Sequence, residues 1–328
     1  MQIETSMQAV IFERAGNAET VLAVHDMPCP VPDRNQVLVR VAARPIQPAD
    51  FLFIEGRYRV KSAFPQVAGL EGVGTVIACG SDVTGLEPGI RVAFRAPGSW
   101  AEFAVAPITR IYPIPPGISD ALACQFALNP LTAWALLSEC DLPKSSRLLI
   151  TAGRSTVARL LAKLAERRGL NATLLVRDGS GYAVLEGNNS RVVSKQATVA
   201  ETLQQIAQHG LFHAILDPIG GPNTLALIDA LEPKGRLISY GVLDDSEIVL
   251  KASHILYKNM IWQGFGIDGW LNNATREHLD IAQRELWEML SAYPDLLPII
   301  GSFSLSRIQE AIRTVRTIHR PGKVLLTG

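Results

Sequence analysis

The sequence feature that most constrains the fold is an alternation of apolar and amphipathic stretches through the middle of the chain. Apolar runs at 147–152, 171–178 and 213–217 are separated by stretches such as 157–168, in which hydrophobic residues recur every three to four positions. Apolar strands with amphipathic helices between them predict a parallel sheet that helices cover on both faces. We therefore expect a doubly wound α/β domain at residues 123–266.

The first third of the chain has a different pattern. Short strand-like runs at 36–43, 72–80, 91–94 and 100–107 are separated by Gly- and Pro-rich stretches such as TGLEPGI. Many short strands joined by glycine-rich turns indicate a mostly antiparallel, barrel-like region. We predict that residues 1–122 form this mostly β domain.

Two further stretches complete the expected architecture. Residues 120–140, DALACQFALNPLTAWALLSEC, have a helical period and lead into the first apolar strand of the α/β domain. Residues 267–328 contain a helical run, REHLDIAQRELWEMLSAY, and end in an extended segment, GKVLLTG. We expect that segment to return to the first domain.

The charge balance and the hydrophobic runs exclude several classes of partner. The chain has 31 Lys and Arg and 31 Asp and Glu, so no electrostatic argument favours nucleic acid or an anionic membrane. No apolar run approaches the ~20 residues that span a bilayer, and the first residues, MQIETSMQAV, lack the pattern of a signal peptide. We expect a cytoplasmic protein that acts on a small molecule, with no nucleic acid or membrane partner.

The cysteines and histidines predict neither a metal site nor a disulfide framework. The four cysteines lie far apart and form no C-x-x-C pair, and the six histidines form no motif with Cys or Asp. A zinc site built from local ligands needs clustered thiolates or regular His spacing. A chain with so large a core also has no need of disulfides. We expect reduced thiols at Cys29, Cys79, Cys124 and Cys140.

One turn is a candidate phosphate site. It follows the first apolar strand of the α/β domain and consists of Gly153, Arg154, Ser155, Thr156 and Val157. Such turns usually carry several glycines, which let backbone N–H groups approach a pyrophosphate at a helix N-terminus. Here one glycine remains, but Thr156 and Ala158 are small, Ser155 is a good N-cap, and Arg154 could add positive charge. The turn by itself fits a nucleotide site and an ordinary strand–helix connection equally well.

The next strand bears on the choice of cofactor. It ends in Arg177, which Asp178 follows. An acidic residue at this place binds the ribose 2′-OH of NAD, whereas an arginine suits the 2′-phosphate of NADP. Arg177 therefore favours NADPH, with a solvated strand end as the alternative.

The order of several motifs resembles a known family. The stretches IQPADFLFIEGRYRVKSAFPQVAGLEGVGTV, LEPGIRV, GSWAEFAV, NPLTAW and GKVLLTG resemble those of the zinc-independent medium-chain dehydrogenase/reductases, in particular the quinone oxidoreductases and trans-2-enoyl-thioester reductases. The resemblance spans nearly the whole chain. It implies a fold of class α/β, with a GroES-like mostly β catalytic domain, a doubly wound Rossmann domain that binds NADPH, and a C-terminal return. It also implies a homodimer, because members are commonly dimers.

The resemblance also bears on the metal and on the chemistry. The zinc alcohol dehydrogenases of the superfamily use a Cys and a His at positions that match Gln47 and Leu70, so the resemblance implies a metal-free member. Conjugate reduction is then favoured: hydride reaches the β-carbon of an activated alkene, and a proton reaches the α-carbon. Tyr58 matches the proposed proton donor. A phenol with the ordinary pKa of ~10 is protonated at neutral pH, as a general acid must be. The alternative is a tyrosine that packs in a turn or contacts the cofactor.

The remaining site assignments also come from the resemblance. Gln47 replaces an asparagine of relatives and could bind substrate or nicotinamide, and Trp270 is expected near the substrate. Cofactor contacts are expected for Asn129, Thr132, Asp217, Tyr240, Gly241, Phe265, Gly266 and Lys323. For each residue, a plain turn or a packed side chain is the alternative.

One departure from the family keeps a second function open. Relatives have Gly-Val-Gly where this chain has Thr156, Val157 and Ala158. The added methyl groups are expected to weaken cofactor binding by ~1–3 kcal/mol, as overpacking does. We therefore hold two hypotheses: an NADPH-dependent, zinc-free reductase of an enoyl thioester, enone or quinone, and a degenerate, non-catalytic member that acts as a sensor or structural protein. A zinc alcohol dehydrogenase, which requires a metal, is a third.

Overall fold

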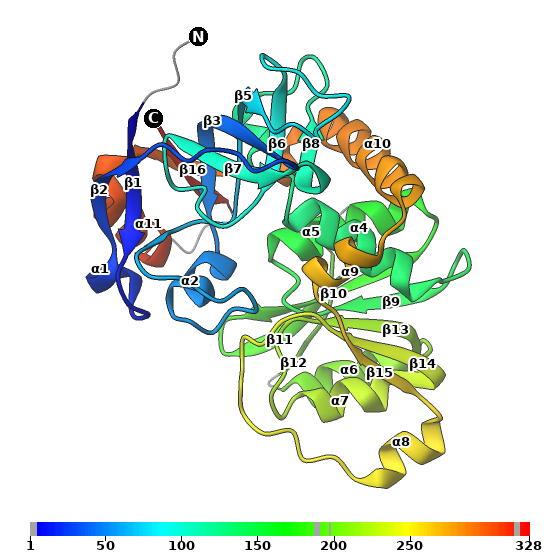
Figure 1. The fold of residues 1–328 in the computed structure, drawn as a ribbon. Coiled ribbons are helices and arrows are strands. Elements are labelled where there is room, and N and C mark those ends of the chain that lie inside the picture. The colour runs from blue at the N-terminus through cyan, green and yellow to red at the C-terminus, as the bar shows by residue number, and fades with distance from the viewer. Residues whose placement is uncertain (1–4, 187–190, 197, 318–321) are drawn as a thin grey trace. The chain divides into compact units, whose positions relative to one another are not determined.

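The computed structural model describes residues 5–186, 191–196, 198–317 and 322–328 (Figure 1). The chain divides into two compact units. The first contains Met1–Leu128 and Glu285–Gly328, and the second contains Asn129–Arg284. The domain boundaries expected from the sequence, at 122/123 and 266/267, stay predictions.

A mostly antiparallel sheet forms the centre of the first unit. Its described strands follow the order β16-β17-β3-β5-β6-β8, with β7 paired to β3, and only the β16–β17 pair among them is parallel. The strands are β3 (Gln36–Ile46), β5 (Glu71–Cys79), β6 (Arg91–Arg95), β7 (Phe103–Pro107), β8 (Ile111–Pro113), β16 (Ile299–Ser304) and β17 (Lys323–Thr327). The predicted strands at 36–43, 72–80, 91–94 and 100–107 fall on β3, β5, β6 and β7.

Shorter elements surround this sheet. A three-stranded sheet has the order β2-β1-β4. Its strands are β1 (Ser6–Phe12), β2 (Ala23–Pro28) and β4 (Gln66–Val67). The helices of the unit are α1 (Ala18–Val21), α2 (Pro48–Ile54), α3 (Asp120–Ala123) and α11 (Ile308–Thr317), with the short 3-10 turns η1 (Ile108–Arg110), η2 (Pro294–Leu296) and η3 (Leu305–Arg307). Helix α10 (Arg276–Ala292) begins in the second unit and ends in the first.

The pattern of β3 explains why it lies at the centre. Successive side chains of a strand point to opposite faces, and β3 is apolar on both. Val37, Val39 and Val41 pack in one hydrophobic cluster, whereas Leu38 packs in another, with residues of β1 and β7. A strand that is covered on both faces in this way has a continuous run of apolar residues, and not an alternation of apolar and polar ones.

The second unit is built on a mostly parallel sheet. In the described residues its strand order is β12-β11-β10-β9-β13-β14-β15. The strands are β9 (Arg147–Ile150), β10 (Asn171–Asp178), β11 (Gly181–Glu186), β12 (Arg191–Gln196), β13 (Phe212–Asp217), β14 (Leu231–Ser239) and β15 (Ile261–Gly264), and the helices are α4 (Asn129–Cys140), α5 (Thr156–Arg167), α6 (Val199–Ala207), α7 (Thr224–Ala230), α8 (Ala252–Lys258) and α9 (Ile267–Asn273).

Helices cover both faces of this sheet. Figure 1 shows α4, α5 and α9 on one face and α6 and α7 on the other. Leu149 of β9, Ile215 of β13 and Leu237 of β14 pack in one cluster with residues of α6 and α7. The predicted fold class, a GroES-like mostly β part plus a doubly wound Rossmann-like sheet, is confirmed.

Two local features differ from the simple pattern. After β10, the chain turns at Gly179, whose φ is +60°, and returns as the antiparallel strands β11 and β12; the strand–helix alternation does not predict this hairpin. The helical stretch 120–140 is split into α3 and α4. Pro130 explains the split, because a residue without an N–H fits the first turn of a new helix but not the interior of a continuous one.

No helix in the described part of the chain is long and apolar enough to cross a bilayer. Its cysteines are free thiols, and Cys124 and Cys140 are buried.

Gly74 tests the close packing of β5 on β3. A Cβ atom at this position would lie 2.0 Å from the Arg40 carbonyl oxygen. We expect Gly74→Ala to lower the free energy of unfolding by about 1–3 kcal/mol, measured by urea denaturation. Gly264→Ala is the control, because a Cβ there meets nothing within 4 Å, and it should change stability by less than about 0.5 kcal/mol. Equal stability of Gly74→Ala and the wild type would contradict this packing.

Candidate active site

A group of buried polar side chains lies inside the first unit, at the start of α2 and on the neighbouring strands. Gln47, Asp50 and Glu71 are each 1% exposed, and Arg95 is 5% exposed. The Gln47 side-chain amide donates a hydrogen bond of 2.5 Å to Glu71 Oε1. Glu71 of β5 and Arg95 of β6 are register partners in the antiparallel ladder. These four residues form what we call the polar cluster.

The local sequence explains the position of Asp50 and Gln47. Gln47 is the N-cap residue of α2, and Pro48 occupies the first turn of the helix. The first turn suits Pro48 because proline has no backbone N–H. Asp50, three residues after Gln47, accepts the Gln47 backbone N–H at 2.9 Å. This bond satisfies a backbone donor at the start of the helix, where the Gln47 side chain in turn accepts from the Asp50 backbone N–H in a capping box.

Burial dominates the electrostatics of the polar cluster. Burial raises the pKa of Asp50 to about 7, although the Gln47 backbone N–H and the charge of Lys323 oppose this rise. Burial likewise raises the pKa of Glu71 to about 8, with the charge of Arg95 opposing and the Asp50 carboxyl reinforcing the rise. The two carboxyls are therefore partly protonated near neutral pH, when Arg95 and Lys323 carry positive charge.

Tyr58 is held at the edge of the polar cluster. It lies in the loop after α2, is half-buried and packs against the core of the unit. Arg95 Nη2 donates a hydrogen bond of 2.9 Å to the Tyr58 hydroxyl oxygen. Because the guanidinium is the donor in this bond, the proton of the hydroxyl is not used in it.

The candidate phosphate turn is in the second unit, at the carboxyl end of β9. Ser155 is the N-cap of α5, and its Oγ accepts the Ala158 N–H at 3.2 Å. Gly153 donates its N–H to the Leu175 carbonyl of β10 at 2.9 Å. A Cβ at Gly153 would lie 2.8 Å from side-chain carbons of Leu174 and Val176. This glycine is therefore needed for the close approach of the turn to β10.

The helix face in this turn differs slightly from the expectation. Leu161 and Leu164 are buried as predicted, but Val157 is only half-buried and the Ala158 side chain is fully buried. The Ala158 methyl group thus packs inside the unit. Thr156 is half-buried at the first position of the helix.

Two arginines lie together beside this turn. The side chains of Arg154 and Arg177 are both exposed, and Arg154 Nε donates to the Arg177 carbonyl oxygen at 3.4 Å. The Arg177 guanidinium lies over the Tyr182 ring at 5.9 Å. Positive charge therefore gathers at the end of β10, next to the N-terminus of α5.

The ends of β13 and β14 form a tight double turn. The Asp217 carboxylate accepts the Thr151 hydroxyl and the backbone N–H of Gly220, the latter at 2.9 Å. A Cβ at Gly241 would lie 2.7 Å from the Pro218 carbonyl oxygen, so a glycine is needed there. Asp217 and Gly241 thus have structural roles that explain them without a ligand.

Tyr240 of the same turn has an unsatisfied group. Its hydroxyl is buried and has no hydrogen-bond partner among the described residues. Burial, reinforced by the charge of Asp217, raises the pKa of this phenol, so it is protonated at neutral pH. A buried hydroxyl without a partner is costly.

The other predicted site residues divide between the two units. Asn129 starts α4, Thr132 is buried in the same helix, Phe265 is buried, and Gly266 is the N-cap of α9. Trp270 meets Trp134 edge to face, with ring centroids 5.8 Å apart. These residues belong to the second unit. Lys323 starts β17 in the first unit, where its charge acts on Asp50 and Glu71.

Comparison with known proteins now bears on this arrangement. The family model of the alcohol dehydrogenase GroES-like domain matches residues 33–116. The human mitochondrial enoyl-[acyl-carrier-protein] reductase is 26% identical over an alignment of 330 residues. The alignment covers 98% of this chain and 88% of that protein. Its bovine counterpart is 26% identical over 289 residues, 85% of this chain and 76% of that protein.

Solved structures agree with these relatives. A candidate NADPH:quinone reductase from Bacillus thuringiensis has a TM-score of 0.86 and 25% identity, covering 99% of this chain and all of that one. Together, these matches support the resemblance of the chain to the medium-chain dehydrogenase/reductase superfamily. A mycobacterial protein in complex with NADPH, at 22% identity and a TM-score of 0.83 over 98% of this chain and all of that one, shares the fold.

The resemblance includes the quinone oxidoreductase and enoyl reductase branch expected from the sequence. At the two positions that match zinc ligands in members of the superfamily, this chain has the amide of Gln47, bonded to Glu71, and the buried alkyl side chain of Leu70. No group of three or more His, Cys, Asp and Glu suited to a metal occurs in the described part of the chain. Zinc independence stays a prediction.

Sequence reasoning missed three members of the polar cluster: Asp50, Glu71 and Arg95. In each case the sequence carried a signal, a charged residue in an otherwise apolar stretch. Such a residue is rarely buried without a partner. What the sequence could not give is which partner each one has. Glu71 and Gln47 are 24 residues apart, and Arg95 and Tyr58 are 37 apart.

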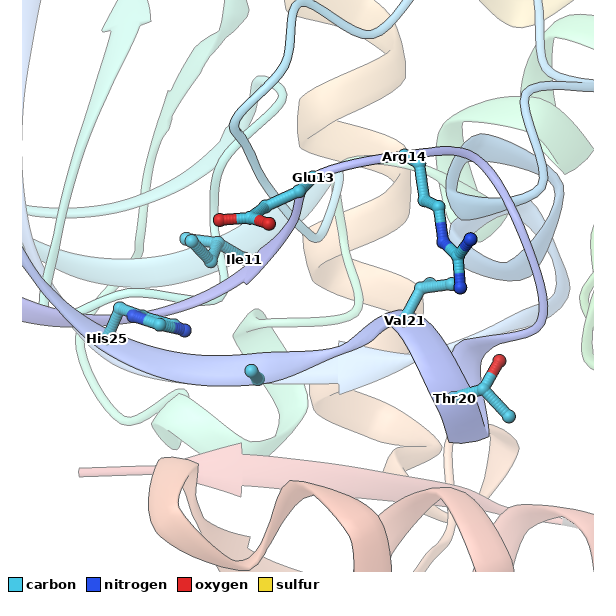
Figure 2. A pocket seen from close by; sticks show the side chains of 7 residues that line it. Ile11, Glu13, Arg14, Thr20, Val21 and His25 are labelled. Carbon is cyan, nitrogen blue, oxygen red and sulfur yellow. The ribbon is translucent and has the colours of Figure 1, made fainter.

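A separate surface pocket of about 420 Å³ lies on the first unit. It is lined by Ile11, Glu13, Arg14, Thr20, Val21, Ala23 and His25. Figure 2 shows these side chains coming from β1, α1, β2 and the loop between β1 and α1. None of the predicted site residues lines it, so it is not part of the candidate site.

The raised pKa values predict how stability depends on pH. An acid whose pKa is higher in the folded state binds more protons there, so the free energy of unfolding falls as pH rises from about 4, the ordinary carboxyl value, to about 8. We expect the double variant Asp50→Asn/Glu71→Gln to lessen this fall by on the order of 3 kcal/mol, measured by urea unfolding at pH 5, 7 and 9. Glu87→Gln, at an exposed site, should keep the wild-type slope. Identical slopes in all three proteins would refute the assignment.

Proposed function

We propose that this protein is an NADPH-dependent reductase of an activated double bond, with an enoyl thioester, an enone or a quinone as substrate. The observation that carries the proposal is the group of donors at the start of α5: a helix N-terminus with Arg154 and Arg177 beside it. Helix N-termini favour phosphate, and guanidinium groups match its geometry. The enoyl reductase relatives support the same reaction class.

The residues of the second unit fit this cofactor. The first N–H groups of α5 have no partner within the helix and can bind a pyrophosphate. Ala158, one of the two substitutions in the turn, packs inward, and the retained Gly153 approaches β10. The partnerless Tyr240 hydroxyl gives the strand ends a further hydrogen-bond donor. The arginine pair at β10 favours a 2′-phosphate, and therefore NADPH over NADH.

When bound, NADPH supplies the hydride for reduction. In the proposed reaction Tyr58 donates the proton, since the bond that its hydroxyl accepts from Arg95 does not use the hydroxyl hydrogen. Gln47 is held by Glu71 and is buried, so we propose that it fixes the polar cluster rather than binding substrate directly. Trp270, packed on Trp134, is proposed to border the substrate.

Cofactor preference gives the first test. We expect Arg154→Ala and Arg177→Ala each to weaken NADPH binding about 10-fold, or ~1.4 kcal/mol, and to leave NADH binding unchanged, because NADH lacks the 2′-phosphate. Nicotinamide fluorescence titration measures both constants. Arg276→Ala, whose side chain is 94% exposed, is the control. If millimolar NADPH gives neither a fluorescence change nor a thermal shift with the wild type, the proposed function fails.

Turnover gives the second test. With crotonyl thioesters, enones and quinones as a panel, we expect steady NADPH oxidation by the wild type. Tyr58→Phe should lower kcat for the preferred enoyl substrate by about 10²–10⁴, as loss of a general acid does, without changing NADPH affinity. Tyr257→Phe, at an 82% exposed position, should behave as the wild type.

Two results would redirect the proposal. NADPH binding without turnover of any panel member would favour the non-catalytic sensor. Full turnover by Tyr58→Phe would assign that tyrosine to packing. The homodimer and the cytoplasmic location stay predictions.

A further inference from the structure

Arg95 stands out among the buried residues of the first unit that the proposed reaction does not yet use. It is the last residue of β6, is 5% exposed, and follows three apolar residues that are fully buried. Removing a guanidinium from water costs several kcal/mol, so its neighbours must compensate. Tyr58 accepts a hydrogen bond from it, and Glu71 faces it across the β5–β6 ladder.

The direction of the Arg95–Tyr58 bond has chemical consequences. A phenol oxygen that accepts from a guanidinium is fixed in position, while its hydrogen is not used in that bond. When the phenol gives up that hydrogen, negative charge develops on the oxygen 2.9 Å from a buried cation. A fixed positive group at the place where charge develops stabilises the transition state, and more so where water is excluded.

Glu71 is the neighbour of Arg95 in the β5–β6 ladder. Its carboxyl is anchored by the Gln47 amide, and its charge and that of Arg95 act on one another. Two hydrogen bonds, Gln47 to Glu71 and Arg95 to Tyr58, therefore lie on register-paired residues of β5 and β6, and the Glu71 and Arg95 side chains interact through their charges. Each bond joins side chains from a different element or loop, so the position of the phenol depends on the packing of the unit.

We propose that Arg95 is a positioning residue for Tyr58: it holds the phenol oxygen and stabilises the phenolate. This inference rests on the proposed function. Bound NADPH would supply the hydride for the β-carbon and leave as NADP+; as the carbon–carbon π bond of the substrate breaks, the Tyr58 O–H bond breaks and its proton joins the α-carbon. The phenolate that remains then takes a proton from water, which restores the tyrosine.

A double-mutant cycle tests the proposal in the full-length protein. The proteins are the wild type, Arg95→Met, Tyr58→Phe and the double variant, assayed with the preferred enoyl substrate. We expect Arg95→Met to lower kcat about 10- to 100-fold with KM within about twofold, and Arg95→Lys to recover part of the loss. In the Tyr58→Phe background, Arg95→Met should have almost no further effect, because its partner is gone. An equal loss in both backgrounds would overturn the proposal.

The matched control lies on the same strand. Arg91 is at the other end of β6, its side chain is 41% exposed, and it pairs with Asp120. Arg91→Met should keep the wild-type kcat. If both methionine variants lose activity to the same degree, the effect belongs to β6 as a whole and the proposal fails.

A second readout needs neither cofactor nor turnover. Alkaline titration followed by phenolate absorbance near ~295 nm, taken as the difference between each protein and its Tyr58→Phe counterpart, isolates the ionisation of Tyr58. Loss of the cation should move this ionisation to higher pH in Arg95→Met and by less in Arg95→Lys. If Arg95→Met does not fold, as judged by circular dichroism, Arg95→Gln and Arg95→Lys take its place, with shifts in the same direction. An unchanged ionisation in the folded variants would overturn the proposal.

This design separates the two claims. A wild type without turnover on the whole panel removes the proposed function, while the titration still decides whether Arg95 acts on the phenol. Turnover that depends on Tyr58 but not on Arg95 removes the further inference alone.

Discussion

The hydrogen bond from the Gln47 amide to the Glu71 carboxyl is the contact on which the polar interior of the first unit depends. It joins the start of α2 to the first residue of β5 in a place where both side chains are almost fully buried. A carboxyl group in such surroundings is unfavourable unless it is bonded or protonated. Here both compensations operate, since Glu71 is bonded and its pKa is raised to about 8. Arg95 is the register partner of Glu71 on β6, and a separate hydrogen bond joins it to the Tyr58 hydroxyl.

The main feature of the second unit is a candidate nucleotide turn with few glycines. The surviving glycine, Gly153, is where a Cβ would collide with β10, so its presence is explained by packing. Ala158 replaces a family glycine at a position whose side chain points into the core. Of the two substitutions in the turn, the one at Ala158 therefore falls where the interior accommodates a small side chain. The exposed end of the helix keeps its serine cap and the two neighbouring arginines.

Hydrophobic periodicity predicted most of the fold. The apolar runs from Arg147 to Asp217 became parallel strands, and the amphipathic runs between them became helices. The antiparallel hairpin of β11 and β12 escaped prediction, because a short alternating strand after a glycine turn differs little from a loop in a pattern dominated by strand–helix units. The site was predicted less completely. Tyr58, Gln47 and Arg177 came from motifs, whereas Asp50, Glu71 and Arg95 did not.

By itself, the sequence determined the two kinds of sheet, the turn before α5 and the resemblance to a reductase superfamily, because periodicity and motifs are local properties of the chain. The tertiary structure alone decided that Arg95 meets Tyr58 and that Gln47 meets Glu71. Those contacts depend on the register of β6 against β5 and on the path of the chain through α2. Arg95 and Tyr58 are 37 positions apart in the sequence, and Gln47 and Glu71 are 24 apart. Burial of the same residues, which raises the pKa values of Asp50 and Glu71, likewise arises only when the surrounding strands close over them.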